Sequence, residues 1–310
     1  MTQLQLRVNP TGIFDEYLRC LNICFPNWGD ERAYNWYLGR NSPGYCSDQM
    51  ILSDDSQILA GGMNTYRIAA FPNGQSARVG ILGGCWTLPE ARGQGCFTRI
   101  FEASRELCAR RSCAYLMAFL LRDRTSFRQL VRAGALAIPS YYLFSTPATP
   151  EPDDAMPLAE LEVDTSGAQE LVERLRQEQQ PFAHFAHTSA DEFLTQFFYR
   201  PGPVHVSKAA DGSIGFVEQI ADTDRLQLLL PAPGPQKNWK RSISAYLGHA
   251  VAGSRKLFLF SMHEAVRKVC LELGMSVKDG YLTLLTIDET IVSKVQNAAS
   301  VWDLQSGDRA

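Results

Sequence analysis

The chain has 310 residues, a net charge of −3 at neutral pH, 45% hydrophobic residues and 20% charged residues. This composition is typical of a globular protein with room for two domains, and the charge gives no overall attraction to nucleic acid or anionic membrane. No run of about 18 apolar residues predicts a membrane span, and the first residues lack the pattern of a signal peptide. We therefore expect a cytoplasmic protein with no membrane partner.

The cysteines favour reduced thiols over a metal site. There are eight of them, and seven lie in the first half of the chain, mostly within apolar runs. None forms a Cys-x-x-Cys pair, and no histidine lies near the first seven. Zinc sites need such spacings. We expect buried, reduced cysteines and no metal.

The first 50 residues predict a strand and two helices. Residues 4–8 alternate between apolar and polar side chains, as in a half-buried strand. Residues 12–24 and 31–38 place apolar side chains at helical spacing, and a turn-rich stretch covers 39–45. Aromatic residues are dense in and beside the two helices. They could form the wall of a ligand site or simply cover the edge of a sheet.

Three consecutive strands follow. Residues 49–52, 57–66 and 76–88 have strand character and are separated by two turn signals, Asp54-Asp55 and Pro72-Asn73-Gly74. Short turns between successive strands predict antiparallel pairing.

The stretch Arg92-Gly93-Gln94-Gly95 lies between the third of these strands and an amphipathic helix. The helix is indicated by apolar or small residues at three- and four-residue steps: Phe97, Ile100, Phe101, Ser104, Leu107 and Cys108. A glycine-bearing turn before a helix gathers free backbone N–H groups that suit an anion such as pyrophosphate. The spacing fits neither the dinucleotide fingerprint nor the phosphate-binding loop, and a tight turn without a ligand is the plain alternative.

The remainder of the first half predicts a buried strand over 114–120, a helix over 125–133 that Gly134 ends, and a last strand over 141–144. Residues 147–160 begin with a proline-rich and acidic run and are expected to link two domains.

The second half repeats this order of elements. When Leu88-Pro89 is aligned with Leu230-Pro231, the helix that begins near Trp239 keeps most of the apolar face of the earlier helix. The turn residues align with residues unsuited to an anion site: Arg92 with Gly234, Gly93 with Pro235 and Gly95 with Lys237.

Residues 86–97 (WTLPEARGQGCF) resemble the signature of the GNAT superfamily of acyl-CoA-dependent N-acyltransferases. Arg92 and Gly95 match it, whereas Phe97 stands where a small residue is usual. The resemblance implies an α+β fold, a mixed sheet flanked by helices, in two tandem GNAT-like domains. Residues 1–146 would carry the acyl-CoA site, 147–160 would be the linker, and 161–310 would form a degenerate second copy.

The resemblance also implies a donor site for acetyl-CoA or another acyl-CoA. The backbone of Trp86, Thr87 and Leu88 would hold the pantetheine and the thioester carbonyl. The pyrophosphate would bind to residues 92–97, that is Arg92, Gly93, Gln94, Gly95, Cys96 and Phe97. Asp123 matches an asparagine that is frequent near the thiol, although a surface turn is an alternative. Leu130 occupies the position of the tyrosine that often protonates the leaving thiolate.

Four side chains are candidates for catalysis. Tyr141 or Tyr142 could act as the acid, and His187, in a segment with His184, has a pKa range suited to a base. Cys85 precedes the predicted thioester site and could form a covalent acyl intermediate. Core packing or simple solvation is the alternative for each. The C-terminal carboxylate is a further candidate base.

We therefore expect an enzyme that moves an acyl group, most simply acetyl, from CoA to a primary amine of a small molecule by direct attack. One alternative is a GNAT-fold transferase with an acyl-carrier protein or an aminoacyl-tRNA as its donor, for which a series of arginines between Arg105 and Arg132 is suggestive. Another is a non-catalytic acyl-CoA-binding or regulatory module. The acceptor, the acyl chain and the oligomeric state have no recognisable signal.

Overall fold

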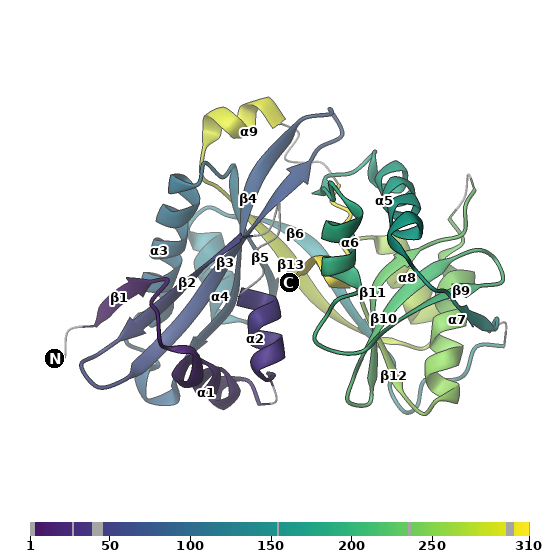
Figure 1. Ribbon diagram of the computed structural model, residues 1–310, viewed down its shortest axis with the longest axis horizontal. Coiled ribbons are helices and arrows are strands. Elements are labelled where there is room, and N and C mark those ends of the chain that lie inside the picture. The colour runs from purple at the N-terminus through teal and green to yellow at the C-terminus, as the bar shows by residue number, and fades with distance from the viewer. Residues whose placement is uncertain are drawn as a thin grey trace. The chain divides into compact units, whose positions relative to one another are not determined.

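The computed structural model describes residues 4–26, 28–38, 46–153, 155–234, 237–295 and 301–309. These residues form two compact units. The first contains the chain up to Ile138 together with residues from Leu282 to Val295, and the second contains Pro139–Tyr281 with residues 301–309. The chain therefore leaves the first unit within strand β6 (Leu136–Phe144) and re-enters it within strand β13 (Ser276–Thr286) (Figure 1).

The first unit is built on a mixed sheet. Its strand order is β1-β2-β3-β4-β5 followed by the end of β13, with β1 to β4 antiparallel and β4 parallel to β5. The strands that are new here are β1 (Gln5–Val8), β2 (Cys46–Ser53), β3 (Ile58–Ala70), β4 (Ser76–Thr87) and β5 (Tyr115–Leu121).

Helices cover both faces of this sheet. The helices are α1 (Phe14–Cys24), α2 (Glu31–Leu38), α3 (Cys96–Arg110), α4 (Thr125–Arg132) and α9 (Glu289–Val295), with a 3-10 turn η1 at Pro89–Ala91. On β2, Met50 and Leu52 pack in the apolar cluster beneath α3, whereas Ile51 packs in the cluster beneath α1. Successive strand residues point to opposite faces, so α1 and α3 lie on opposite sides of the sheet.

The second unit repeats this plan. Its sheet has the order β6-β12-β11-β10-β9-β7, and β11 and β12 are its parallel pair. The strands are β7 (Leu158–Glu160), β9 (Val204–Ala209), β10 (Ile214–Ile220), β11 (Thr223–Leu230) and β12 (Lys256–Ser261), together with a short strand β8 (His184–Phe185). The helices are α5 (Thr165–Gln179), α6 (Ala190–Phe197), α7 (Trp239–Ala252) and α8 (Glu264–Glu272), with a 3-10 turn η2 at Ser306–Arg309. One apolar cluster lies beneath α7 and α8, and another lies beneath α5 and α6.

The two units differ from the contiguous halves expected from the sequence, 1–146 and 161–310. The strand expected to end the first half, over 141–144, pairs antiparallel with β12 of the second unit, from Tyr141 opposite Ser261 to Phe144 opposite Phe258. The last residues of β13 instead lie with β5, where the Thr283 hydroxyl donates to the Ala118 carbonyl at 3.1 Å. Strand pairing is a long-range choice, so local patterns could place these strands but not their partners.

The segment expected as a linker, 147–160, is packed into the second unit. The Thr149 hydroxyl donates to the Gly274 carbonyl at 3.3 Å, and β7 pairs with β9. The proline-rich residues therefore form part of a folded surface rather than a spacer between two folded parts.

Within the part of the chain that the structure describes, no helix has the length and apolar character needed to cross a bilayer. The same residues contain no cluster of three or more side chains that could ligate a metal ion. The seven cysteines with described side chains are free thiols.

Candidate active site

Strands β4 and β5 diverge after a short paired stretch. These strands lie within residues 76–121, all of which the structure describes, and they pair only from Val79 opposite Tyr115 to Ile81 opposite Met117. Beyond Ile81, β4 stays paired to β3 on its other side, up to Thr87 opposite Ala60. One edge of β4 therefore presents backbone groups without a strand partner, and an extended ligand that contains amides could pair with them.

A bulge shapes the open part of β4. The register between β3 and β4 shifts between Gly61 and Met63, and Gly84 has a φ of 56°. Bulges bend a strand and change the direction of its backbone groups, and they are frequent beside functional sites. The Gly83-Gly84 pair within the strand is a sequence signal that could have located this bulge.

The turn after β4 leaves the N-terminus of α3 open. Leu88 donates its N–H to the Leu59 carbonyl at 2.9 Å, which holds the end of the strand. Gly93 and Gly95 have φ values of 83° and 75°, and α3 begins at Cys96 without a side-chain cap. A Cβ at either glycine would meet no atom within 4 Å. Uncapped N–H groups at a helix start, together with the helix dipole, form a site suited to an anion.

The other turn residues leave this space clear. Gln94 folds back so that its side-chain amide donates to the Glu90 carbonyl at 3.1 Å. Cys96 is buried, and Phe97 stacks on Phe101 with ring centroids 6.4 Å apart. The bulky Phe97, which departs from the GNAT signature, is thus accommodated in the apolar cluster beneath α3. Arg92 is exposed beside the turn.

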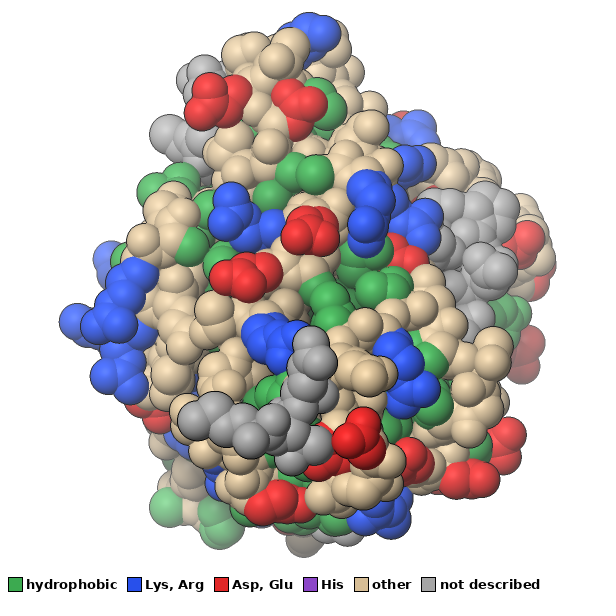
Figure 2. Space-filling model, turned by 90° about the vertical axis from the view of Figure 1, so that its left-hand side faces the viewer, with side chains coloured by type: hydrophobic (Ala, Val, Ile, Leu, Met, Phe, Trp, Pro, Cys, Tyr) green, Lys and Arg blue, Asp and Glu red, His purple; other side chains and the backbone are tan. Residues whose placement is uncertain are grey.

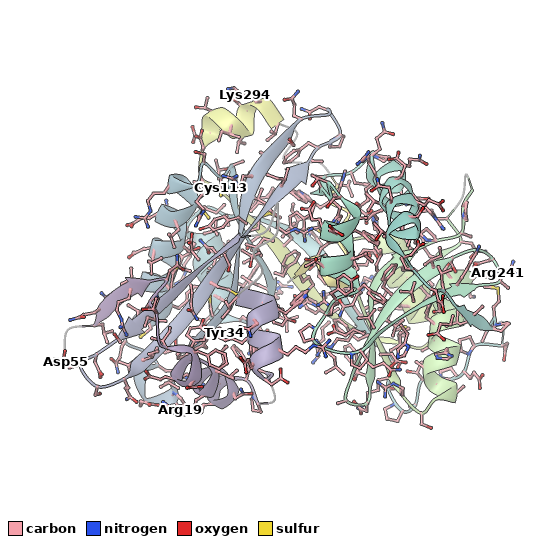
Figure 3. The ribbon with its side chains drawn as sticks, viewed as in Figure 1. Arg19, Tyr34, Asp55, Cys113, Arg241 and Lys294 are labelled. Carbon is pink, nitrogen blue, oxygen red and sulfur yellow. The ribbon has the colours of Figure 1, made fainter. Side chains whose placement is uncertain are left out.

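Trp86 and Leu88 turn their side chains into the apolar cluster beneath α1, so these residues can offer a ligand only their backbone. The Trp86 ring meets Tyr17 edge-on at 5.3 Å. Burial raises the pKa of the Tyr17 hydroxyl above its usual value. Tyr34 hydrogen-bonds to Gln49 at 2.9 Å and lies among the side chains of the first unit in Figure 3. Tyr17 is buried in the cluster beneath α1 and is therefore part of the core.

Cys85 is a poor candidate for a covalent intermediate. Burial raises the pKa of its thiol to about 12. The thiol donates weakly to the Gly83 carbonyl at 3.7 Å and packs against the apolar cluster beneath α3. The thiolate is the nucleophilic form of cysteine, so at neutral pH Cys85 stays in its unreactive form.

Tyr141 and Tyr142 both belong to the second unit. Burial and a hydrogen bond to Glu264 raise the pKa of Tyr141 to about 12. Tyr142 meets Phe260 edge-on at 5.3 Å, and the guanidinium of Arg309 lies 4.4 Å from its ring centroid. Both tyrosines are therefore held by neighbours in that unit.

His184 and His187 are buried rather than solvated. His187 packs against Phe197 and Phe193, with ring centroids 5.2 and 5.8 Å away. Burial lowers the pKa of His184, whose Nδ1 lies 3.0 Å from the Phe182 carbonyl oxygen. Both histidine side chains are therefore buried within the second unit. The C-terminal carboxylate of Ala310 lies outside the described residues.

Asp123 lies on the surface. Its side chain is 79% exposed, with one oxygen 3.9 Å from Arg124. Leu130, at the position of the usual tyrosine acid, is completely buried in the cluster beneath α3. The series of arginines is not uniformly free for a nucleic acid, because Arg111 makes two 2.8 Å hydrogen bonds to Asp48. On the face in Figure 2, basic and acidic side chains are interspersed.

Sequence reasoning missed a buried polar network that holds the far end of α3. The Asp48 carboxylate also accepts hydrogen bonds from Tyr66 and Asn9, each at 2.8 Å. These bonds and the Arg111 charge outweigh burial and lower the pKa of Asp48 to about 2. The residues are scattered over the first 111 positions, so no sequence spacing could have revealed the network.

In the second unit, the helix start that aligns with the turn before α3 has a side-chain cap. The Asn238 side chain caps α7 by accepting the Arg241 N–H at 3.1 Å, and Lys237 forms an ion pair with Glu178 at 2.9 Å. The N-terminus of α7 therefore already has a side-chain acceptor where α3 has none. Pro235, aligned with Gly93, lies outside the described residues.

Strands β11 and β12 of the second unit also diverge, and the C-terminal segment of the chain hydrogen-bonds to both of them there. These two fully described strands pair only up to Leu226 opposite Leu259. Farther along β11, Leu229 donates its N–H to Gln305 at 2.8 Å and accepts from the Gln305 amide at 3.2 Å. The Phe260 N–H on β12 donates to Ser306 at 2.8 Å. The C-terminal segment thus hydrogen-bonds to the edges of β11 and β12 where these strands no longer pair with each other. In the first unit, the corresponding edge of β4 has no strand partner.

No protein-family model matches the chain, and no curated protein matches it in sequence. Solved structures match its fold. A tandem GNAT protein from the clavulanic acid biosynthesis pathway gives a TM-score of 0.66 at 14% identity, over 92% of this chain and 99% of that one. A probable N-acyltransferase of unknown function from Enterococcus faecalis V583 gives 0.62 at 12% identity, over 94% and 74% of the two chains. A GCN5-related N-acetyltransferase from Anabaena variabilis gives 0.60 at 11%, over 98% and 85%.

The observed strand orders, the parallel pair in each unit and these matches agree with the resemblance seen in the sequence. The first unit has an uncapped helix start after its glycine-bearing turn, and the aligned helix start in the second unit has a side-chain cap. The chain therefore has the tandem GNAT fold.

Proposed function

We propose that the chain transfers an acyl group, most simply acetyl, from CoA to a primary amine of a small molecule, and that the donor binds in the first unit. The observation that carries this proposal is the uncapped N-terminus of α3 directly after the unpaired edge of β4. The glycine φ values, the open space beside Gly93 and Gly95 and the missing side-chain cap all support it. Arg92 adds a positive charge beside the same turn.

In this proposal the N–H groups of residues 93–97 bind the pyrophosphate of CoA. The backbone of residues 86–88 holds the pantetheine and orients the thioester carbonyl. A donor held in this way has its thioester carbon in a fixed position. Part of the entropy that the two reactants must lose to react is then lost when the donor binds, which lowers the barrier of the chemical step.

The amine attacks the thioester carbonyl directly. A C–N bond forms and the C–S bond breaks, the amine loses its proton to solvent, and CoA leaves as a thiolate that solvent protonates. The raised pKa of Cys85 argues against a covalent intermediate, and Leu130 offers no hydroxyl where the family often has its acid. Solvent is therefore the simplest source and acceptor of protons here.

A second function shares the donor site. An acyl-CoA-binding module without turnover is favoured by one specific observation, the completely buried Leu130 at the position of the tyrosine acid. We prefer the enzyme because water can protonate a thiolate without a dedicated side chain. Free thiols at all seven cysteines with described side chains are in keeping with the cytoplasm as its location.

The test combines binding and turnover. Calorimetry with acetyl-CoA, longer acyl-CoAs and free CoA should show one donor per chain, and thiol release from acetyl-CoA should rise with a panel of small primary amines. Binding without amine-dependent thiol release would support the binding module. No binding of any CoA would refute the donor site and favour a donor on an acyl-carrier protein or a tRNA.

A further inference from the structure

A cavity of about 390 Å³ lies within the second unit, apart from every residue used in the donor proposal. Its lining comes from β6, β11, β12 and η2, and the residues that matter here are Tyr142, Phe144, Arg225, Lys256, Phe258 and Arg309. This volume is within the range of small-ligand sites. Tyr142, which drew attention in the sequence as a possible acid, is thus part of its wall.

The lining residues share one face of the sheet. Phe144 on β6 lies opposite Phe258 on β12, and Phe258 lies opposite Arg225 on β11. The alternate residues Leu143, Leu259 and Leu226 pack instead beneath α7 and α8. Because successive strand residues point to opposite faces, the rings and the arginine belong to the face turned away from those helices.

The charge of this lining has one sign. Arg225, Lys256 and Arg309 line the cavity, and none of the described lining residues is a carboxylate. Lys256 forms an exposed ion pair with Asp222 at 2.7 Å, and Lys278 lies 5.5 Å from the Phe144 ring centroid. Asp224, the neighbour of Arg225 in sequence, is held by Arg255. The lining thus carries Arg225 and Arg309 as cations besides the lysine that Asp222 pairs.

The aromatic walls are partly buried and fixed in place. The Arg309 guanidinium lies 4.4 Å from the Tyr142 ring centroid and 5.9 Å from that of Phe258, so it is positioned by the rings rather than extended into solvent. Aromatic rings offer apolar area at a low entropic cost, and an arginine can bind a carboxylate or phosphate with two parallel hydrogen bonds.

We propose that this cavity binds a small organic anion, a carboxylate or phosphate on a flat apolar body. The anionic group would lie against Arg225 and Lys256, and the apolar body against Tyr142, Phe144 and Phe258. This site is independent of the acyl donor, and its ligand need not be a substrate.

The experiment is calorimetry on the full chain with three probes of similar shape: benzoate, phenyl phosphate and benzylammonium. The two anions should bind and the cation should not, and added salt should weaken binding because the cavity is open to solvent. Benzoate and phenyl phosphate together show whether the site prefers a carboxylate or a phosphate. No binding of either anion, or equal binding of the cation, would overturn the proposal.

Variants locate the site. Arg225→Gln and Lys256→Gln together should weaken anion binding about tenfold, as expected for the loss of charge-assisted hydrogen bonds. Arg241→Gln, at an exposed arginine of α7 in the same unit (Figure 3), is the matched control and should change nothing. The N-terminus of α3 also suits phosphate, so Gly95→Asp tests whether the anions bind there instead. If they bind in the cavity, this variant should leave benzoate binding intact. If Gly95→Asp abolishes binding while the double variant keeps it, the anions bind elsewhere and the proposal fails.

Discussion

A carboxylate placed at the start of α3 should weaken donor binding while the chain keeps its fold. Gly95 has a φ of 75° and a Cβ there would meet no atom within 4 Å, so Gly95→Asp adds a negative charge into open space. Gly74, in the turn between β3 and β4, has a φ of 78° and is equally open. Gly74→Asp is therefore a matched control for the cost of a left-handed residue, about 1–2 kcal/mol in both variants.

The expected loss of affinity follows from Coulomb's law. A carboxylate about 5 Å from one phosphate charge is repelled by about 1–3 kcal/mol at an effective dielectric constant between 20 and 80. A loss of about 2 kcal/mol weakens binding about thirtyfold. At a concentration of acetyl-CoA one hundred times the wild-type Kd, ligand stabilisation should fall from about 2.7 to about 0.9 kcal/mol.

Thermal unfolding with and without acetyl-CoA measures this difference. The ligand-induced shift in Tm should shrink to about a third in Gly95→Asp and stay at the wild-type value in Gly74→Asp. If both variants keep the full shift, or both lose it equally, the donor does not bind at the N-terminus of α3. Raising the ionic strength should reduce the difference between the variants, since the added carboxylate is exposed.

Three further outcomes are expected. Asp48→Asn should lower the free energy of unfolding at pH 7 by about 2 kcal/mol. The pKa of Asp48 is lowered to about 2 in the folded protein. The stabilisation by its carboxylate is therefore complete above the ordinary pKa of aspartate and is lost as the pH falls toward 2. Urea titrations from pH 7 to 2 measure it, with the exposed Asp123→Asn as control, and a pH-independent loss would contradict the linkage. Cys85→Ala should keep amine-dependent thiol release within about threefold of the wild type, because a thiol with a raised pKa makes no covalent intermediate; an acyl adduct on Cys85 in a mass spectrum would refute direct attack. Gln305→Ala should cost about 1–3 kcal/mol by leaving both backbone groups of Leu229 unpaired, and unchanged stability in urea would show that these bonds do not hold the C-terminal segment.

Much of the local structure could be predicted from the sequence. Helix α2 and strand β4 begin at the expected residues, and the turns at Asp54-Asp55 and Pro72-Asn73-Gly74 separate the strands as expected. Apolar periodicity and glycine positions carry this information because they act within one turn or one hairpin. The open N-terminus of α3 belongs to the same class, since it depends on two glycines and the adjacent helix.

The candidate catalytic residues could not be judged in this way. Tyr141 and His187 are ordinary candidates by residue type, but Tyr141 is bound to Glu264 and His187 packs against two phenylalanines. The pKa and accessibility of a side chain depend on groups that are distant in sequence. The network around Asp48 was invisible for the same reason.

The sequence by itself determined the order of helices and strands, the repeat of that order in two halves and the helix start that can hold an anion. These features follow from contacts between residues close together in the chain. Only the tertiary structure decided that strand β6 completes the second unit, that β13 completes the first, and that the C-terminal segment fills the gap between β11 and β12. Each of these depends on which distant backbone edge is left to be paired, and the free energy of that choice is spread over the whole unit.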